Sequence, residues 1–287
     1  MRIIEIKAKS ILVKSKLPAT DYVVNPYIGC SFACGYCYAS FMGRFINEPI
    51  QEWGNYVYVK TNAAELFAKE IAKFSEKKRD ATILLSSVTD AWQGPEKKYQ
   101  LARQILQCLN KYAYPGLVSI LTKSPLILRD VDIITGLLQK EVGVTITSTD
   151  DEISRFIEAH APRALQRLRT LKALNEANVP TYAFVGPLLP HFRYRPELLD
   201  DLFCAIRDAG TTSIFVEHLN TSPYVLGRIA PLMATADMNI RVAYESARTA
   251  EHRKAVTDLV LDLVKKYQFD LRLGRVLDHN RDKREQI

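Results

Sequence analysis

The chain has 287 residues, of which 47% are apolar and 25% charged, and its formal net charge is +7. This composition is ordinary for a soluble globular protein. No apolar run approaches the ~20 residues that a membrane helix needs, and Met1–Lys7 carries charges inside its apolar stretch, unlike a secretory signal. We therefore expect a cytoplasmic protein in a reducing compartment, with no membrane partner.

Short apolar strands alternate with longer amphipathic helices through the middle of the chain. Strands rich in β-branched and aromatic residues are predicted at residues 22–27, 81–87, 117–123, 142–148, 181–186 and 213–219. Helices are predicted at residues 63–74, 96–112, 130–139, 163–176 and 196–209. In the fourth helix, an apolar stripe is predicted from leucines that recur every three residues: Leu165, Leu168, Leu171 and Leu174. A further helix at residues 245–267 is expected to cap or close the open side of the fold.

The alternation of strands and helices predicts βαβ units with right-handed crossovers and a parallel sheet. From the pattern alone, both a partial barrel of six units and an open doubly wound sheet are compatible. No internal repeat or low-complexity linker interrupts the chain. Residues 1–287 are therefore expected to form one domain, with a core at about 21–220 and a helical extension at about 221–287.

Three cysteines lie within eight residues, after the first predicted strand. Cys30, Cys34 and Cys37 have the spacing C-x3-C-x2-C in the run GCSFACGYCY. Three thiolates at this spacing can bind three irons of a [4Fe–4S] cluster and leave the fourth iron open to a substrate or cofactor. The loop leads into residues 40–60, whose aromatic residues Trp53 and Tyr56 could cover such a cluster or pack in the core.

Other uses of the three cysteines fit less well. Structural zinc prefers a second C-x2–4-C pair at a distance, but the remaining cysteines, Cys108 and Cys204, are isolated. Disulfides would need an oxidising compartment, and a glycine-rich loop does not suit three packed core cysteines. A cluster is the leading interpretation, with zinc second. Cys108 and Cys204 lie in predicted helices and are expected to be small buried apolar residues.

The cysteine motif resembles that of the radical S-adenosylmethionine (SAM) superfamily. Five stretches within about residues 21–220 are similar to the branch that includes spore photoproduct lyase: NPYIGC at 25–30, CYA at 37–39, SVTDAWQGPE at 87–96, LTKS at 121–124 and HAPR at 160–163. The resemblance implies an α/β fold, a partial (β/α)6 barrel of the TIM-barrel type in a single domain with N- and C-terminal extensions. It also implies a [4Fe–4S] cluster on Cys30, Cys34 and Cys37 whose open iron binds SAM.

Ligands of parallel α/β folds gather at the carboxyl ends of the strands, and the resemblance implies SAM contacts there. The candidate residues are Tyr36, Val185 and Gly186 for the adenine, Ser87 and Asp90 for the amino group, Lys123 for a carboxylate or ribose oxygen, Thr145 and Thr147 for the ribose, and Arg163 for the methionine carboxylate. Asp90 could instead cap the following turn, the threonines could reflect strand propensity, and Arg163 could face solvent. Glu217 or His218 could face the substrate, although a lone histidine is more often structural.

The resemblance implies reductive cleavage of SAM to methionine and a 5′-deoxyadenosyl radical, which abstracts hydrogen from a substrate. In the lyase pattern a hydrogen-donating cysteine follows the second strand, where this chain has Ser87 or Val88. That departure argues against the same thymine-dimer repair. The expected function is a radical SAM lyase or transferase whose substrate is a small molecule, a peptide or a nucleic-acid base. Its expected partner is a one-electron donor such as flavodoxin or ferredoxin.

Two alternative functions remain open. The first is a spore photoproduct lyase-like enzyme of nucleic-acid repair or modification, which the +7 charge permits. The second is a non-catalytic iron–sulfur protein for electron transfer or sensing. Lysines and arginines are spread along the chain at helical spacing among acids, and the C-terminal run 279–287 is mixed in sign, which indicates a solvated end rather than a basic arm.

Overall fold

The computed structural model describes residues 1–74 and 80–278, so the C-terminal run 279–287 lies outside the described residues. The chain packs as two compact units that are interleaved in sequence. The first unit consists of Met1–Ala33, Ala39–Val144 and Ala173–Thr181, and the second of Cys34–Tyr38, Thr145–Lys172 and the residues from Tyr182 onward. The cysteine motif crosses from the first unit into the second, and the single domain stays a prediction.

The first unit contains a mostly parallel sheet with the strand order β2-β3-β6-β7-β8. β3 (Tyr22–Val24), β6 (Ile83–Leu85), β7 (Leu117–Thr122) and β8 (Gln139–Thr145) run parallel, and β2 (Leu12–Lys14) pairs antiparallel with β3. The register joins Val24 to Leu85 and Leu85 to Ile120, and all three side chains are buried. Buried apolar side chains of this kind are typical of parallel strands that are covered on their faces.

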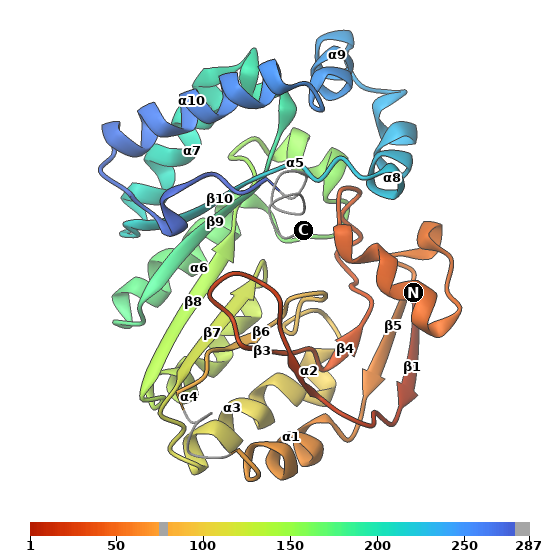
Figure 1. The fold of residues 1–287 in the computed structure, drawn as a ribbon, viewed down its shortest axis with the longest axis vertical. Coiled ribbons are helices and arrows are strands. Elements are labelled where there is room, and N and C mark those ends of the chain that lie inside the picture. Colours follow the sequence, from red (N-terminus) through yellow and green to blue (C-terminus); the bar gives the residue numbers. More distant parts are fainter. Residues whose placement is uncertain (75–79, 279–287) are drawn as a thin grey trace. The chain divides into compact units, whose positions relative to one another are not determined.

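Helices accompany this sheet (Figure 1), and they are shorter than the sequence predicted. They are α1 (Ala63–Ile71), α2 (Glu96–Tyr99), α3 (Leu101–Lys111) and α4 (Val131–Thr135). The predicted helix 96–112 is broken at Gln100, whose φ of 51° is left-handed. The predicted helix 130–139 is confined to α4; the 3₁₀ turn η4 (Pro125–Asp130) precedes it, and β8 begins at Gln139.

A second, three-stranded sheet of the first unit was not predicted from the sequence. Its order is β1-β5-β4, formed by β1 (Arg2–Ile6), β5 (Tyr56–Lys60) and β4 (Tyr27–Ile28). Residues 40–60 form the 3₁₀ turns η1 (Tyr38–Ile46) and η2 (Ile50–Glu52) before β5. Trp53 and Tyr56 are buried, which confirms core packing for these two aromatic residues.

The second unit has three parallel strands, β9 (Thr181–Leu188), β10 (Ser213–His218) and β11 (Asp270–Leu271). Its helices are α5 (Asp151–Ile157), α6 (Ala164–Glu176), α7 (Pro196–Asp208), α8 (Pro223–Met233), α9 (Met238–Ser246) and α10 (Ala250–Lys266), with 3₁₀ turns η5 (Pro190–Arg193) and η6 (Arg272–Gly274). The predicted helix 245–267 is α10, which begins later because Thr249 caps it by accepting a hydrogen bond from the His252 amide. In the described part of the chain, no helix combines the length and hydrophobicity that crossing a bilayer requires.

The predicted leucine stripe of α6 is only half right. Leu171 and Leu174 are fully buried, whereas Leu165 is 54% exposed. A three-residue spacing falls short of the 3.6-residue turn, so a stripe with this period drifts around the helix. As a result, Arg167 takes the buried position one turn before Leu171, and its whole residue is 1% exposed.

Candidate functional site

The three cysteines of the motif lie on one loop that contains little regular structure of its own. Cys30 and Cys34 are buried, Cys37 is half-buried, and none of the chain's five cysteines, all within the described residues, forms a disulfide. No group of three His, Cys, Asp or Glu side chains among the described residues is placed to hold a single metal ion. Three thiols in one short loop are, by their chemistry, a donor set for an iron–sulfur cluster.

The backbone around Cys30 is held by the side chain of Gln93, which is fully buried. Gln93 Oε1 accepts a hydrogen bond from the Ser31 amide at 2.7 Å, and Gln93 Nε2 donates to the Gly29 carbonyl at 3.1 Å. The Thr89 hydroxyl also donates to the Gly29 carbonyl, at 2.6 Å. One amide group therefore binds the chain on both sides of Cys30. Although Gln93 stands in the run SVTDAWQGPE, sequence reasoning assigned it no role.

Gly29 is needed at its position for two reasons. Its φ is +90°, in the region that favours glycine, and a Cβ there would collide with the Tyr56 carbonyl and ring. The backbone of the loop at Gly29 therefore packs directly against Tyr56, the first residue of β5.

Ser87 lies where the sequence placed it, after β6, and is bound to the end of β3. Asn25 Oδ1 accepts hydrogen bonds from the amides of Ser87 (3.0 Å) and Val88 (3.1 Å), and Asn25 Nδ2 donates to Ser87 Oγ at 2.9 Å. The carboxyl ends of these neighbouring parallel strands are thus tied together by one side chain.

Asp90 ties the same loop to β7. Its carboxylate accepts hydrogen bonds from Thr122 Oγ1 (2.8 Å) and from the amides of Lys123 (2.8 Å) and Trp92 (2.9 Å). Burial raises the pKa of Asp90, and these hydrogen bonds oppose that rise. The bond to the Trp92 amide confirms the turn-capping interpretation, while contacts of Asp90 and Lys123 with SAM stay predictions.

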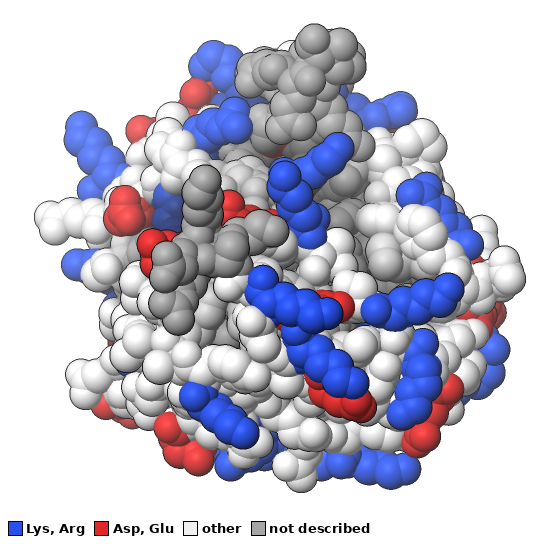
Figure 2. Space-filling model, turned by 60° about the horizontal axis from the view of Figure 1, so that its bottom comes forward, with Lys and Arg blue, Asp and Glu red and all other residues white. Residues whose placement is uncertain are grey.

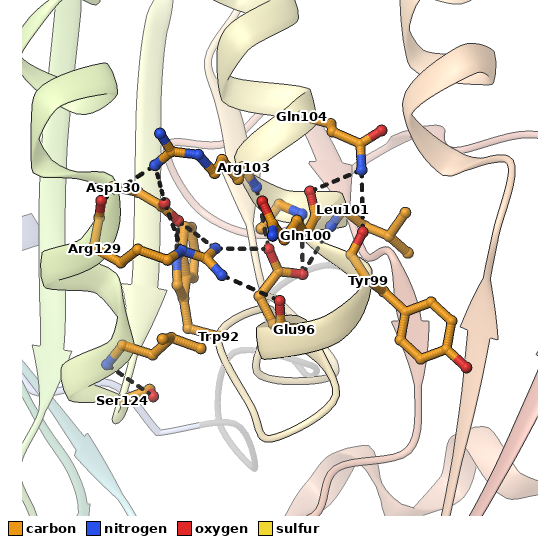
Figure 3. Close-up of polar contacts among 12 residues, drawn as sticks. Trp92, Glu96, Tyr99, Gln100, Leu101, Arg103, Gln104, Ser124, Arg129 and Asp130 are labelled. Carbon is orange, nitrogen blue, oxygen red and sulfur yellow. Dashed lines mark hydrogen bonds and ion pairs between the residues drawn. The ribbon is translucent and has the colours of Figure 1, made fainter.

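A buried charge network anchors the segment that carries Gln93 (Figure 3). Trp92 Nε1 donates to Asp130 at 2.9 Å, and Arg129 bonds both Asp130 (2.8 Å) and Glu96 (3.1 Å). Glu96 also accepts hydrogen bonds from the Tyr27 hydroxyl and from the first amide of α3. Although burial acts to raise the pKa of Asp130, its hydrogen bonds from Arg129, Arg103 and Trp92 hold that pKa below the ordinary value.

In the second unit, Tyr36 is tied to a buried ion pair. The Tyr36 hydroxyl donates to Glu158 Oε1, while Glu158 Oε2 accepts from Arg167 Nη2 at 2.5 Å and from Thr147 Oγ1 at 3.1 Å. Arg167 also donates to the carbonyls of Pro162 (2.7 Å) and Thr145 (3.3 Å). Burial, followed by the negative charges of Cys34 and Glu158, raises the pKa of Tyr36 well above its ordinary value, so Tyr36 remains a neutral donor.

The backbone of Cys34 and Gly35 has further partners in the second unit. The Gly35 amide donates to the Ile157 carbonyl at 2.8 Å, and Arg228 donates to the carbonyls of Cys34 (3.2 Å) and Gly35 (3.3 Å). A Cβ at Gly35 would clash with the side chain of Leu232 in α8. Helices α5 and α8, neither of which was predicted, thus supply contacts to this half of the cysteine loop.

The structure brings Tyr36 and Thr147 to Glu158 and the Thr145 carbonyl to its partner Arg167, and it leaves Arg163 aside. Arg163 is exposed, and its backbone amide bonds the Gln166 side chain at 3.0 Å. The buried arginine is Arg167, one helical turn later. Sequence reasoning chose Arg163 because a guanidinium at the start of the predicted helix suits the methionine carboxylate. The drift of the α6 stripe was the signal that could have identified Arg167 as buried.

The structure also gives the surroundings of the other residues that the sequence singled out. Val185 is fully buried in β9, and a Cβ on Gly186 would collide with the Phe184 ring. His218 Nε2 lies 2.8 Å from Thr257 Oγ1, in agreement with a structural histidine. The expectation that Cys108 and Cys204 are buried was wrong, because both are half-buried.

His191 lies in η5, shortly after β9, and was missed by the sequence analysis. It is 3% exposed, and neither ring nitrogen has a hydrogen-bond partner among the described residues. Burial, followed by the positive charge of Arg195, lowers the pKa of His191 to about 4, with Asp150 opposing. The imidazole is therefore neutral at neutral pH.

Comparison with known proteins agrees with the resemblance that the cysteine motif indicated. The model of the radical SAM superfamily matches residues 24–202. An uncharacterized protein of Methanocaldococcus jannaschii is 40% identical over 190 residues, which are 66% of this chain and 69% of that protein. Another, of Mycobacterium tuberculosis, is 30% identical over 277 residues, 92% of this chain and 80% of that protein.

Solved structures of spore photoproduct lyase are similar to this chain in fold. The complex with dinucleoside spore photoproduct has a TM-score of 0.69 at 14% identity and covers 92% of this chain and 79% of that chain. A mutant with bound AdoMet and dinucleoside spore photoproduct has a TM-score of 0.66 at 14% identity and covers 93% and 79%. At such identity the likeness shows the fold alone, and it confirms the predicted α/β fold of the radical SAM type.

Replacing Gln93 should loosen the backbone on both sides of Cys30, because two hydrogen bonds are lost. Gln93→Leu leaves the Gly29 carbonyl and the Ser31 amide without this partner, so the free energy of unfolding should fall by about 1–3 kcal/mol. Urea unfolding measures this, and iron content after reconstitution should fall as well. Gln107→Leu, on the exposed face of α3, is the matched control. Equal iron content in both variants would contradict the role given to Gln93.

Breaking the buried Arg167–Glu158 ion pair should lower the free energy of unfolding by more than Gln93→Leu does. Arg167→Met leaves the Glu158 carboxylate buried without its cation, and a loss of about 3–5 kcal/mol in the free energy of unfolding is expected. Arg169→Met, an exposed change in the same helix, should have little effect. The double variant Glu158→Gln with Arg167→Met should recover part of the loss, because no lone charge remains. A single variant as stable as the wild type would refute this account of the pair.

Stability should fall as the solution becomes acidic. The pKa values of both His191 and His252 are lowered to about 4 in the folded protein. The unfolded chain therefore binds more protons below its histidine pKa of about 6.5, and the free energy of unfolding should decrease between about pH 6.5 and about pH 4. Urea unfolding at about pH 7 and about pH 5 should show a smaller decrease for His191→Phe. The exposed control His160→Phe should keep the wild-type dependence.

Proposed function

The chain belongs to the radical SAM superfamily, and from that membership we propose that it reductively cleaves SAM at a [4Fe–4S] cluster and abstracts hydrogen from a substrate. The observation that carries the proposal is the loop of Cys30, Cys34 and Cys37, whose thiols are not used in disulfides and whose backbone is fixed by buried side chains. Membership of the superfamily itself implies SAM and an iron–sulfur cluster.

The three cysteine thiolates would hold the cluster. Once bound, the cluster and SAM supply one-electron cleavage of a sulfonium carbon–sulfur bond, which gives methionine and a 5′-deoxyadenosyl radical. The protein's part is to hold the loop in place. Gln93 fixes the chain on both sides of Cys30, and Glu158 fixes Tyr36 between Cys34 and Cys37. Partners of this kind set the position of metal-binding residues.

For SAM itself, we infer contacts with residues at the strand ends. Ser87 and Lys123 follow β6 and β7, and Thr147 follows β8. Because the Tyr36 hydroxyl is taken by Glu158, only its ring and backbone are available to an adenine. The proposal that Arg163 binds the methionine carboxylate now rests on the sequence resemblance alone, since Arg163 is exposed.

The substrate differs, in our proposal, from that of spore photoproduct lyase. Ser87 and Val88 occupy the turn after β6, and no cysteine lies in that turn. A nucleic-acid base is a second candidate, favoured by the net charge of +7 and by the lysine and arginine side chains on one face of the molecule (Figure 2). In that view the basic side chains are interspersed with neutral and acidic ones, so they do not form a single continuous stripe.

The test is anaerobic reconstitution with iron and sulfide, followed by incubation with SAM and dithionite. Mass spectrometry should detect 5′-deoxyadenosine and methionine with the wild-type protein and neither with Cys34→Ala. Cys108→Ala, half-buried in α3 and outside the motif, should keep the activity. Methylthioadenosine would show that the other carbon–sulfur bond breaks. A stable cluster with no cleavage, even with candidate substrates added, would instead support electron transfer or sensing.

A further inference from the structure

Lys60, the last residue of β5, extends its side chain to the end of β3. Its Nζ donates a hydrogen bond to the Asn25 carbonyl at 2.7 Å. The side chain of that same Asn25 binds Ser87 after β6. The Lys60 ammonium therefore lies at the carboxyl ends of two neighbouring parallel strands, which is where ligands of parallel α/β folds bind.

This ammonium has no counter-charge among the described residues. Its hydrogen-bond partner is a neutral carbonyl, no carboxylate contributes to its electrostatics, and burial alone lowers the pKa of Lys60 to about 8. By contrast, two other partly buried cations of the first unit, Arg103 and Arg129, both bind the carboxylate of Asp130. A desolvated charge is costly unless a partner offsets it, and lysines are seldom buried without one.

A purely structural role does not explain the choice of lysine here. The Asn25 carbonyl needs one donor, which a neutral side chain could provide without the cost of desolvating a charge. Lysine offers three donors, and a single hydrogen bond uses one of them. A second lysine, Lys123, follows β7 at the same edge of the sheet. Lys123 has the Asp90 carboxylate as a charge partner, whereas Lys60 lies next to an uncharged pair, Asn25 and Ser87.

We propose that Lys60 binds an anionic oxygen group, a carboxylate or a phosphate, of a ligand at the carboxyl ends of β3 and β6. This inference rests on the proposed function, since it identifies a ligand group of the same site. An anion would supply the missing counter-charge and accept the unused N–H bonds. Two sources offer this chemistry: the methionine carboxylate of SAM, and an acidic group of the substrate.

The test uses the cluster-reconstituted protein and three probes: SAM, inorganic phosphate and the thymidine dinucleotide pTpT. Brief acetylation with acetic anhydride, read by mass spectrometry, gives the reactivity of Lys60 relative to the exposed Lys73. A saturating probe that contacts Lys60 should slow its acetylation about tenfold and leave Lys73 unchanged, because only the unbound fraction reacts. This measurement needs no variant, so a variant that fails to fold does not prevent the test.

Isothermal titration calorimetry with the protecting probe then measures how much Lys60 contributes to the binding affinity. Lys60→Met removes the charge but keeps the length of the side chain, and should weaken binding about 10- to 100-fold, as expected for a charge-assisted hydrogen bond. Lys60→Arg should lose less, and Lys73→Met should bind like the wild type. Iron content after reconstitution should be equal in all of these proteins, because Lys60 is not placed among the cluster ligands.

The outcomes separate the two sources and the two proposals. Protection by SAM alone identifies the methionine carboxylate, and protection by phosphate or pTpT identifies a substrate group. If no probe protects Lys60 and Lys60→Met binds all three like the wild type, the inference is wrong. Protection without any 5′-deoxyadenosine in the cleavage assay would contradict the proposed function while leaving the anion site intact.

Discussion

The hydrogen bonds of Gln93 to the two peptide groups beside Cys30 are the interaction on which the first unit's half of the motif depends. A loop cannot satisfy its own backbone as a helix or sheet does, and buried peptide groups need partners. One buried amide group provides both a donor and an acceptor to consecutive peptides. Around it, Asp90, Glu96 and Asp130 fix the segment that carries Gln93 to the neighbouring strand and helices.

Buried carboxylates hold neighbouring elements together at several places in this protein. Each of them lies at a junction between elements and is surrounded by donors, such as Glu158 with Tyr36, Thr147 and Arg167. Burial of a charge is unfavourable on its own, but a fully bonded carboxylate fixes several chain segments at once. These junctions hold the segments whose side chains bond the cysteine loop, since the loop itself contains little regular secondary structure.

Lys60 differs from this pattern, and the proposed anion site rests on that difference. The carboxylates Asp130 and Glu158 are paired with arginines of the protein, whereas the Lys60 ammonium meets a carbonyl oxygen. In a fold whose strand ends carry the proposed SAM contacts, an unpaired cation at the same edge indicates a place for a ligand.

The sequence by itself determined the α/β class, the order of the main strands and the family, because hydrophobic periodicity and the spacing of Cys30, Cys34 and Cys37 are local properties of the chain. Only the tertiary structure decided which polar residues support the loop, because the partners of Gln93, Arg167 and Lys60 lie 62, 9 and 35 positions away in sequence. The short strands β1 and β5 escaped prediction for the same reason, since pairing between distant segments defines them. Arg163 and Arg167 have the same chemistry, but Arg163 stands just before α6 and is exposed, whereas Arg167 lies on the buried face of that helix.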